Sequence, residues 1–498
     1  MGNDTAFTVL RTSFLRKLAL SLGSVALLLS ACKAPQPNKP NIIWVVWEDM
    51  SPDLHCYGNP MVRSPTLDRM AAQGIRYTNA FANGTVCTPS RTSIAVGMYQ
   101  NTIGGGEMRL PDSLKPDLPK GVVPFTQLLQ NNGYLTANIT DKPGNGKLDW
   151  EFRLAGKPFE KNHWDALKGN QPFFAYINLH RTHRPFKVDT PFRIDPQHIS
   201  IPPYYPDNVV SRKDFANYYG DIQELDQHIG DVLDSIRAKG LEKNTILFFF
   251  SDHGRDFPRA KHWLYNSGTH IPLIISTLDH QPLPNKLKRG SVQHRLINGI
   301  DITATTLALA NVPLPSYLQG VPFLGKSRAP EREYAYGASD QVGGIAYKSR
   351  SVRNKQFLYI RNYNTDITVN DSITAYNRAY QPLYQAIDLL HSQNRLDRFQ
   401  MKLVQPLQPE ELYDLQEDTF QIHNLANDQK YQRQLIKMRK ALDRWQQDIE
   451  DQAGLSADSA RIHYFKNYRT QSDKKYKQKA QQLRRRVKQD LAAENNDL

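Results

Sequence analysis

The 498-residue chain is predicted to fold as an α/β layer sandwich followed by a smaller α+β domain. Continuous apolar runs, typical of strands buried on both faces, are separated by segments with apolar residues at helical spacing. After about residue 335 the long runs give way to short strand-like segments and one long amphipathic helix. Strands that alternate with helices imply helices packed on the faces of a sheet.

The three apolar runs of the first part each end in acidic or histidine residues. Asn41–Trp47 stops at Glu48-Asp49, Phe173–Leu179 at His180, and Thr245–Ser251 at Asp252-His253. Taken singly, each acid could be a loop residue or a helix cap. Ligands of open α/β sheets, however, gather at the carboxyl ends of the strands. We therefore expect these side chains to share one site, where the several carboxylates favour a hard divalent cation.

Helical segments are predicted between and after these runs. They are placed at 65–74, 125–133, 215–240 and 300–310, the third with a stripe of Ile222, Leu225, Ile229, Leu233 and Ile236. In the second part we expect strands at 351–353, 357–360 and 411–415 and a helix over 431–448. Residues 365–403 carry no strand pattern and are either an insertion beside the substrate cleft or a purely structural helical insert.

The chain is basic, with a formal net charge of +14 from 63 Lys and Arg against 49 Asp and Glu. A basic surface attracts polyanions such as nucleic acid, anionic lipid headgroups or sulfated glycans. Part of the excess lies in residues 474–488, KKYKQKAQQLRRRVK. This stretch is either a solvated helix or a surface that holds a polyanionic substrate or a membrane. The 40% hydrophobic content is that of a folded soluble body with a sizeable core.

The N-terminus has the pattern of an export signal. Basic residues at 11, 16 and 17 precede the apolar run 18–29, which is shorter than the ~20 residues of a membrane-spanning helix. The run ends in Leu29-Ser30-Ala31-Cys32, which resembles a bacterial lipobox and so implies cleavage before Cys32 and lipidation of that residue. An ordinary signal peptide or an uncleaved anchor are the alternatives.

We accordingly predict a lipoprotein signal peptide at 1–31 and a proline-rich tether at 32–40. The expected partners of this region are the export and lipoprotein-processing machinery. The protein would be lipid-anchored in the bacterial cell envelope, at the outer membrane, facing the periplasm or the surface. The lipid would be its only membrane contact.

The three cysteines do not suggest a disulfide framework. One of them opens the pentapeptide Cys87-Thr88-Pro89-Ser90-Arg91, which resembles the C-x-P-x-R signature of sulfatases. In that family the cysteine is converted after translation to formylglycine, whose hydrate is the nucleophile. The alternative is a buried cysteine before a helix that starts at a proline.

The resemblance to sulfatases extends over most of the chain after residue 40. Besides the strand ends, it rests on His55-Cys56-Tyr57-Gly58, with Cys56 structural, on Ser64–Ala71, on Lys261–Tyr265 with Ile271–Ile274, and on Glu411–Leu415 followed by Asn424-Leu425. Residues 171–186, with Trp150 and Trp164 upstream, look like the heparan-N-sulfatase-like branch, which includes many polysaccharide sulfatases.

The resemblance implies an alkaline-phosphatase-like sandwich. A large central mixed sheet would be flanked by helices, and a smaller C-terminal α+β domain would hold a short antiparallel sheet. The corresponding boundaries are a catalytic domain at 41–335, the C-terminal subdomain at 336–470 and a basic tail at 471–498.

Carried over residue by residue, the resemblance assigns roles to the site. The metal ligands would be Glu48, Asp49, Asp252 and His253, around one divalent cation expected to be Ca²⁺. Arg91 would hold the aldehyde hydrate of Cys87, from which Asp252 accepts a proton. Lys261 would contact the sulfate. His183 or His262 would protonate the leaving oxygen, since histidine titrates near neutrality, and His180 is a further substrate-binding candidate.

Two positions depart from the family pattern. The first acid pair is usually Asp-Asp, and Glu48 adds a methylene. After Gly133-Tyr134-Leu135-Thr136, where sulfatases often carry Gly-Lys-x-His, the chain reads Thr140-Asp141-Lys142-Pro143. Lys142 is therefore the candidate substrate-binding lysine, and the histidine is absent. These departures favour a specialised carbohydrate sulfatase over an enzyme for small aryl esters.

The sequence thus predicts a sulfuric ester hydrolase that acts on a sulfated polysaccharide or oligosaccharide, with one divalent cation and formylglycine. Its partners would be the glycan and a formylglycine-generating or sulfatase-maturing enzyme, and not nucleic acid. Two alternatives remain open. One is a phosphodiesterase or phosphonate hydrolase of the same fold, and the other is a non-catalytic glycan-binding lipoprotein with an unmodified Cys87.

Overall fold

The computed structural model describes residues 39–278, 281–451 and 459–496. The chain divides into two compact units after Lys39, and the fold is that of Pro40–Leu498. The predicted signal peptide at 1–31, the lipidation candidate Cys32 and all but the last two residues of the tether lie outside the described residues. None of the described helices has the length and apolarity needed to cross a membrane.

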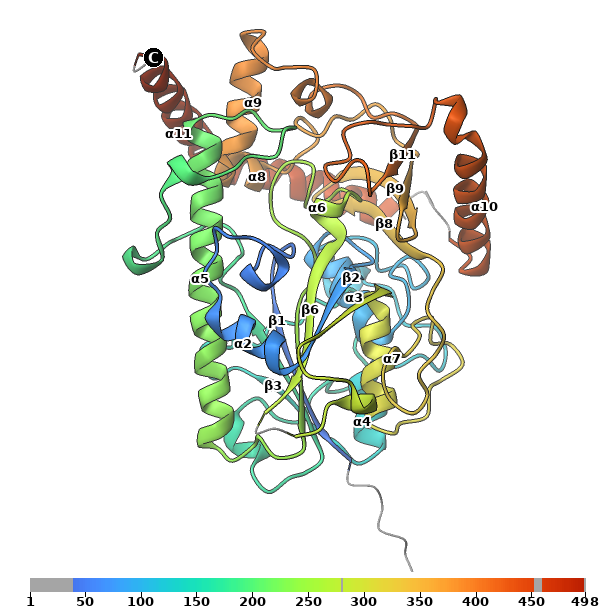
Figure 1. The fold of residues 1–498 in the computed structure, drawn as a ribbon. Helices are drawn as coiled ribbons and strands as arrows, with labels where there is room; N and C mark the ends of the chain where they lie inside the picture. Colours follow the sequence, from blue (N-terminus) through green and yellow to red (C-terminus); the bar gives the residue numbers. More distant parts are fainter. Residues whose placement is uncertain (1–38, 279–280, 452–458, 497–498) are drawn as a thin grey trace, which may run out of the picture. The chain divides into compact units, whose positions relative to one another are not determined.

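A seven-stranded mixed sheet forms the centre of the first part (Figure 1). Its strands are β1 (Asn41–Trp47), β2 (Ile75–Phe81), β3 (Leu135–Ile139), β4 (Phe173–Leu179), β5 (Thr245–Ser251), β6 (His270–Thr277) and β7 (Ser291–Asn298). The order is β3-β4-β1-β5-β6-β2-β7. Neighbours pair in parallel from β3 to β5, whereas β6 is antiparallel to both of its neighbours.

Helices cover both faces of this sheet, and alternate residues of each strand meet them. The odd-numbered residues of β1 from 43 to 47 pack in the core shared by α2 (Pro65–Gln73) and α5 (Val209–Ala238). Its even-numbered residues face α4 (Phe125–Asn131) and α7 (Ile300–Leu309) (Figure 1). Burial on both faces explains the continuous apolar runs, and the predicted sandwich with a large mixed sheet is confirmed.

The second part is built on a four-stranded antiparallel sheet of order β11-β10-β9-β8. Its strands are β8 (Ala335–Val342), β9 (Ile345–Arg353), β10 (Phe357–Asn362) and β11 (Glu410–Asp414). The amphipathic helix α10 (Gln432–Asp448) packs on it through Leu435, Met438, Leu442 and Trp445. The short antiparallel sheet expected in the C-terminal part is confirmed.

Residues 365–403 contain α8 (Ala375–Tyr380) and α9 (Pro382–Ser392). α9 packs against α5, and both α8 and α9 pack against the last helix, α11 (Ser459–Asn496). α11 runs through the boundary predicted at residue 470, so the basic stretch 474–488 belongs to one long helix rather than to a separate tail. This helix and α8 cover the end of the sheet at which β1 finishes (Figure 1).

Candidate active site

The ends of β1, β4 and β5 meet at one edge of the central sheet. β1 lies between the other two, with Trp47 in register with both Leu179 and Ser251. The residues that follow are therefore neighbours: Glu48, Asp49, His180, Asp252 and His253. The three acids are fully buried, at 0% exposure. A protein interior tolerates such carboxylates only when they are paired or bind a cation.

Helix α3 (Cys87–Val96) brings the signature pentapeptide to the same edge. Pro89 lies in its first turn, where its missing N–H costs no helical hydrogen bond. Gly97 ends the helix with a φ of 66°, a left-handed conformation that glycine adopts without strain. Cys87 and Arg91 are four residues apart, so their side chains lie one turn apart on the same face of the helix. The whole helix is buried.

Cys87 lies at the centre of the cluster. Its Sγ is 3.4 Å from Nε2 of His253 and 3.8 Å from Oδ1 of Asp49. Burial raises the pKa of the Cys87 thiol. Because the thiolate is the reactive form, the unmodified side chain is a poor nucleophile at neutral pH.

Arg91 holds the end of β5. Its Nε and Nη2 are each 3.0 Å from Oδ2 of Asp252, and it also donates to the hydroxyl of Tyr176. Burial opposes the charge of the guanidinium, but Tyr176, Asp252 and Glu48 outweigh this cost and raise the pKa of Arg91. The site therefore contains a permanent positive charge one helical turn from Cys87.

Lys261 supplies a second buried cation. Its Nζ is 2.7 Å from Oδ2 of Asp49 and 3.8 Å from Oδ2 of Asp256. Burial opposes ionisation of Asp49, yet the charges of Lys261, His183 and His253 hold the pKa of that carboxyl well below its ordinary value. Asp49 is therefore an anion within the cluster.

Glu48 is also an anion, although its carboxylate is buried. Its Oε1 is 3.1 Å from Nδ1 of His180 and accepts from Nδ2 of Asn178 at 2.9 Å. Its Oε2 is 2.8 Å from Nζ of Lys147. Burial opposes ionisation, but the hydrogen bond with His180 and the charges of Lys147 and Arg91 hold the pKa of Glu48 well below its ordinary value.

Lys147 is a site residue that sequence reasoning missed. Lys142, the predicted substrate lysine, is exposed on the loop after β3, and the described residues show no contact between it and the cluster. Lys147 instead reaches Glu48, and it also pairs with Oδ2 of Asp149 at 3.1 Å. The available signal was Gly146-Lys147, which supplies the Gly-Lys of Gly-Lys-x-His, with Asp149 where the histidine would stand.

His183 and His180 stack on each other, with ring centroids 4.6 Å apart. Nδ1 of His183 is 2.7 Å from the carbonyl oxygen of Arg184, so this nitrogen carries the proton. Nε2 then faces the cluster, 4.0 Å from Oδ2 of Asp49. Burial lowers the pKa of His183.

His262 has a different setting. Its ring is buried and stacks on Tyr347 at 5.3 Å with an interplanar angle of 9°. Burial, together with the charge of Lys261, lowers the pKa of His262 to about 3. The ring is therefore neutral at physiological pH and has no acidic proton to give.

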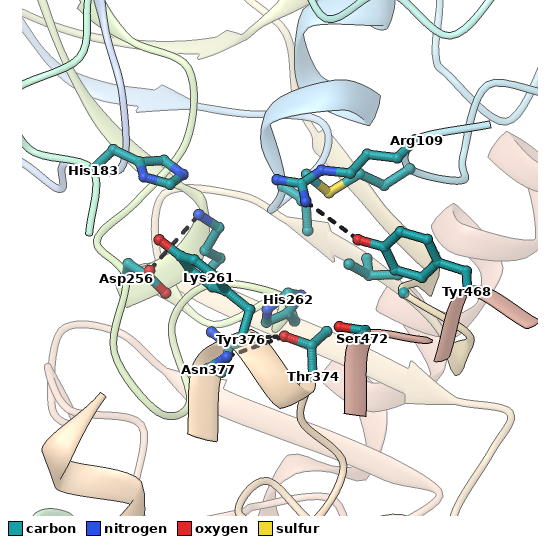
Figure 2. A pocket seen from close by; sticks show the side chains of 14 residues that line it. Arg109, His183, Asp256, Lys261, His262, Thr374, Tyr376, Asn377, Tyr468 and Ser472 are labelled. Atoms are coloured by element: carbon teal, nitrogen blue, oxygen red, sulfur yellow. Dashed lines mark hydrogen bonds and ion pairs between the residues drawn. The ribbon is translucent and has the colours of Figure 1, made fainter. Parts of the chain in front are cut away.

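A cleft lies beside these residues, and distant parts of the chain line it (Figure 2). Figure 2 shows Tyr376 and Asn377 on the same side of the cleft as Asp256, Lys261 and His262, with Arg109 and Tyr468 on the other side. His183, Thr374 and Ser472 also line the cleft. Nη1 of Arg109 is 3.3 Å from the hydroxyl of Tyr468, and the hydroxyl of Tyr464 donates to the carbonyl of Arg109 at 2.7 Å. Residues 365–403 and α11 thus both contribute to the cleft.

The donor atoms of the cluster fit a hard divalent cation. Ligand atoms of Glu48, Cys87 and His183, and those of Asp49, Cys87 and His253, lie within 4.8 Å of one another in each group. His253 donates from Nδ1 to the carbonyl of its neighbour Gly254, so that Nε2 faces the site. Among the described residues the two groups share Cys87 and make one site, where the carboxylates of Glu48 and Asp49 offer the oxygen donors that a hard cation prefers.

Comparisons with known proteins agree with this chemistry. The sulfatase family model matches residues 40–151 and 161–312. An ulvan-active sulfatase of Formosa agariphila is 32% identical over 470 residues, covering 84% of this chain and 76% of the relative. Human N-sulphoglucosamine sulphohydrolase is 25% identical, covering 86% of this chain and 93% of the relative.

The fold by itself is shared more widely. The solved structure of a phosphonate monoester hydrolase from Silicibacter pomeroyi has a TM-score of 0.59 at 16% identity, covering 83% of this chain and 96% of that one. The fold therefore does not distinguish a sulfatase from a phosphonate hydrolase, and the class of ester that is hydrolysed is inferred from the relatives and from the residues of the site.

Proposed function

Because this chain belongs to the sulfatase family and is a sulfuric ester hydrolase, we propose a specific reaction for it. The enzyme removes sulfate from a sulfated carbohydrate through a nucleophile made from Cys87. The setting of Cys87 carries the proposal. Its Sγ lies among buried ligand groups at the first turn of α3, where free N–H groups favour an anion. Conversion to formylglycine by a maturation enzyme would supply a hydrated aldehyde, a nucleophile that the neutral thiol cannot match.

We propose that one divalent cation is held by Glu48, Asp49, Asp252 and His253. The predominance of oxygen donors favours Ca²⁺. When bound, such a cation neutralises sulfate oxygens and stabilises the charge that develops on them. Glu48 keeps the carboxylate of the usual Asp-Asp pair and also pairs with Lys147.

Three cations of the chain itself lie in the cluster, each paired with a different acid of the site: Arg91 with Asp252, Lys147 with Glu48 and Lys261 with Asp49. Preorganised positive charge of this kind is usually the largest contribution to catalysis at an anionic centre. In this assignment Arg91 orients the nucleophile and Lys261 contacts the sulfate. Lys147 takes the role that the sequence predicted for Lys142. Asp252, bound to Arg91, accepts the proton of the nucleophile.

The leaving oxygen needs a proton, and His183 is the better placed of the two candidates. Its Nδ1 keeps its proton on the carbonyl of Arg184, so Nε2, which faces the cluster 4.0 Å from Asp49, would first take up a proton and then give it to the leaving oxygen. His262 is instead buried with its ring stacked on Tyr347. His180 is half-exposed beside His183 and stays a substrate-binding candidate.

A sulfated glycan is the substrate that the cleft favours. Tyr376 and Tyr468 offer aromatic faces on which a sugar ring can pack, and Arg109 offers a cation near them. The names of the two relatives also point to carbohydrate sulfates. We further propose that the protein is exported and lipid-anchored through Cys32 in the cell envelope, where such glycans are met.

The test is sulfate release by protein co-produced with a formylglycine-generating enzyme. Sulfated oligosaccharides and one phosphonate monoester are the substrates. We expect sulfate release by the unaltered protein and by Cys56→Ala, a matched control at the other cysteine of the described body, but none by folded Cys87→Ala. Sulfate release by Cys87→Ala would refute the proposal. Faster hydrolysis of the phosphonate than of every sulfate would favour a phosphonate hydrolase.

A further inference from the structure

A second cavity, of about 650 Å³, lies beside the cleft, between α11 and the segment that leads into α8. Gly343, Thr374 and Ser472 line both the cleft and this cavity, so the two adjoin. In Figure 2 Thr374 and Ser472 lie side by side at the edge of the cleft. A chain that occupies the cleft can therefore continue into the second cavity.

The walls of the second cavity carry an excess of positive charge. Its cations are Arg378, Arg469, Lys474 and Lys477, against Asp371 and Asp473. Arg378 is already paired with Asp388 at 3.0 Å. The described residues show no ion pair for Arg469, Lys474 or Lys477. These three charges of α11 are thus available to an anion.

Charged residues of α11 line the cavity at the spacing of one face of the helix. Arg469, Asp473 and Lys477 follow one another at the spacing of a helix turn and so share the side of α11 that lines the cavity. Lys475, about 200° away from Lys477 around the helix, lines neither the cavity nor the cleft. The helix therefore offers a matched pair of positions, with and without access to the cavity.

We propose that this cavity binds a sulfate or carboxylate group on the glycan residues next to the one whose sulfate is removed. The inference deepens the proposed function and rests on it for the identity of the glycan. From Arg469 to Gln481 the cavity follows α11 for about 18 Å, which is longer than one sugar ring. The protein would then prefer sulfated oligosaccharides to sulfated monosaccharides, with Arg469, Lys474 and Lys477 determining that preference.

Binding to the Cys87→Ala protein tests this inference without turnover. The probes are an ulvan tetrasaccharide, which carries sulfate and uronic carboxylate, a carrageenan tetrasaccharide, whose only anions are sulfates, and rhamnose 3-sulfate. Replacing Arg469, Lys474 and Lys477 together by Gln should weaken tetrasaccharide binding about tenfold and flatten its salt dependence. Binding of the monosaccharide should change less than about twofold. Lys475→Gln should leave every affinity unaltered.

Each outcome bears on the proposal. Weaker binding of both tetrasaccharides identifies sulfate as the bound group, and weaker binding of the ulvan probe alone identifies the carboxylate. The proposal is overturned if the triple replacement changes neither tetrasaccharide, if the monosaccharide or Lys475→Gln shows the same loss, or if the unaltered cavity binds no tetrasaccharide. Failure of the unaltered enzyme to release sulfate would count against the proposed function alone.

Discussion

Replacing Lys147 by Met tests the position at which sequence and structure disagree about the site. Nζ of Lys147 lies 2.8 Å from Glu48, whose side chain is fully buried, while the Lys147 side chain is 23% exposed. The change removes one of the three cations of the cluster that we propose binds the sulfate, and it leaves an apolar chain of similar length. We expect kcat/KM for a sulfated oligosaccharide to fall.

The magnitude follows from the charge that is lost. A unit charge about 4 Å from a developing anion contributes roughly 4 kcal/mol at an effective dielectric constant of about 20. At about 1.4 kcal/mol for each factor of ten, this amounts to roughly 10³ in rate. Partial exposure of Lys147 reduces the effect, so we expect a fall of about 10² to 10³.

Lys142→Met is the matched control, because Lys142 is exposed on the same loop. We expect its kcat/KM to stay within about twofold of the unaltered enzyme, as for an exposed charge outside the site. Urea denaturation of both variants separates loss of folding from loss of catalysis. A larger loss from Lys142→Met than from Lys147→Met, or activity of Lys147→Met within about threefold of normal, would refute this reasoning.

Three further outcomes are expected. Burial raises the pKa of Glu151 to about 7, above its unfolded value, so the stability that its protonation contributes is complete below pH ~4.5 and is lost as pH rises through 7. In urea denaturation, the free energy of unfolding of Glu151→Gln should therefore rise relative to that of the unaltered protein by up to about 3 kcal/mol between pH 4.5 and 8. A difference in unfolding free energy that does not change with pH would argue against this. Arg184 and Asp214 form a buried bidentate pair with both N–O distances at 2.8 Å. Arg184→Met should therefore lower the free energy of unfolding, measured by urea denaturation, by about 3–5 kcal/mol. A decrease in the free energy of unfolding below about 1 kcal/mol would show that the pair is dispensable. Chelation with EDTA should abolish sulfate release and Ca²⁺ should restore it, because three of the four proposed ligands, Glu48, Asp49 and Asp252, are carboxylates. Restoration by Zn²⁺ alone would contradict the assigned metal.

Much of the site follows from local sequence because it lies at strand ends. The runs before Glu48 and Asp252 are continuously apolar from Ile42 to Trp47 and from Ile246 to Phe250, which indicates central strands, and central parallel strands bring their carboxyl ends together. The pentapeptide from Cys87 to Arg91 forms one helical turn, so its geometry is also local. These parts needed no knowledge of distant contacts.

The parts that sequence reasoning missed depend on loops and on long-range packing. Lys142 and Lys147 occupy one irregular loop, where no periodicity determines which side chain turns inward. Tyr468 joins the cleft because α11 packs on α8, and no local pattern encodes that contact. The boundary predicted at residue 470 fell inside α11 because the change in charge along the helix is not a change in fold.

The proportion of Cys87 carrying the aldehyde, compared with the rate of sulfate release, tests the central claim most directly. Preparations made with increasing amounts of the maturation enzyme would be analysed by mass spectrometry of the peptide that contains Cys87, and each would be assayed on one sulfated oligosaccharide. We expect the rate to rise in proportion to the aldehyde fraction and to extrapolate to zero for the pure thiol. Full activity of protein whose Cys87 is entirely thiol would contradict the claim.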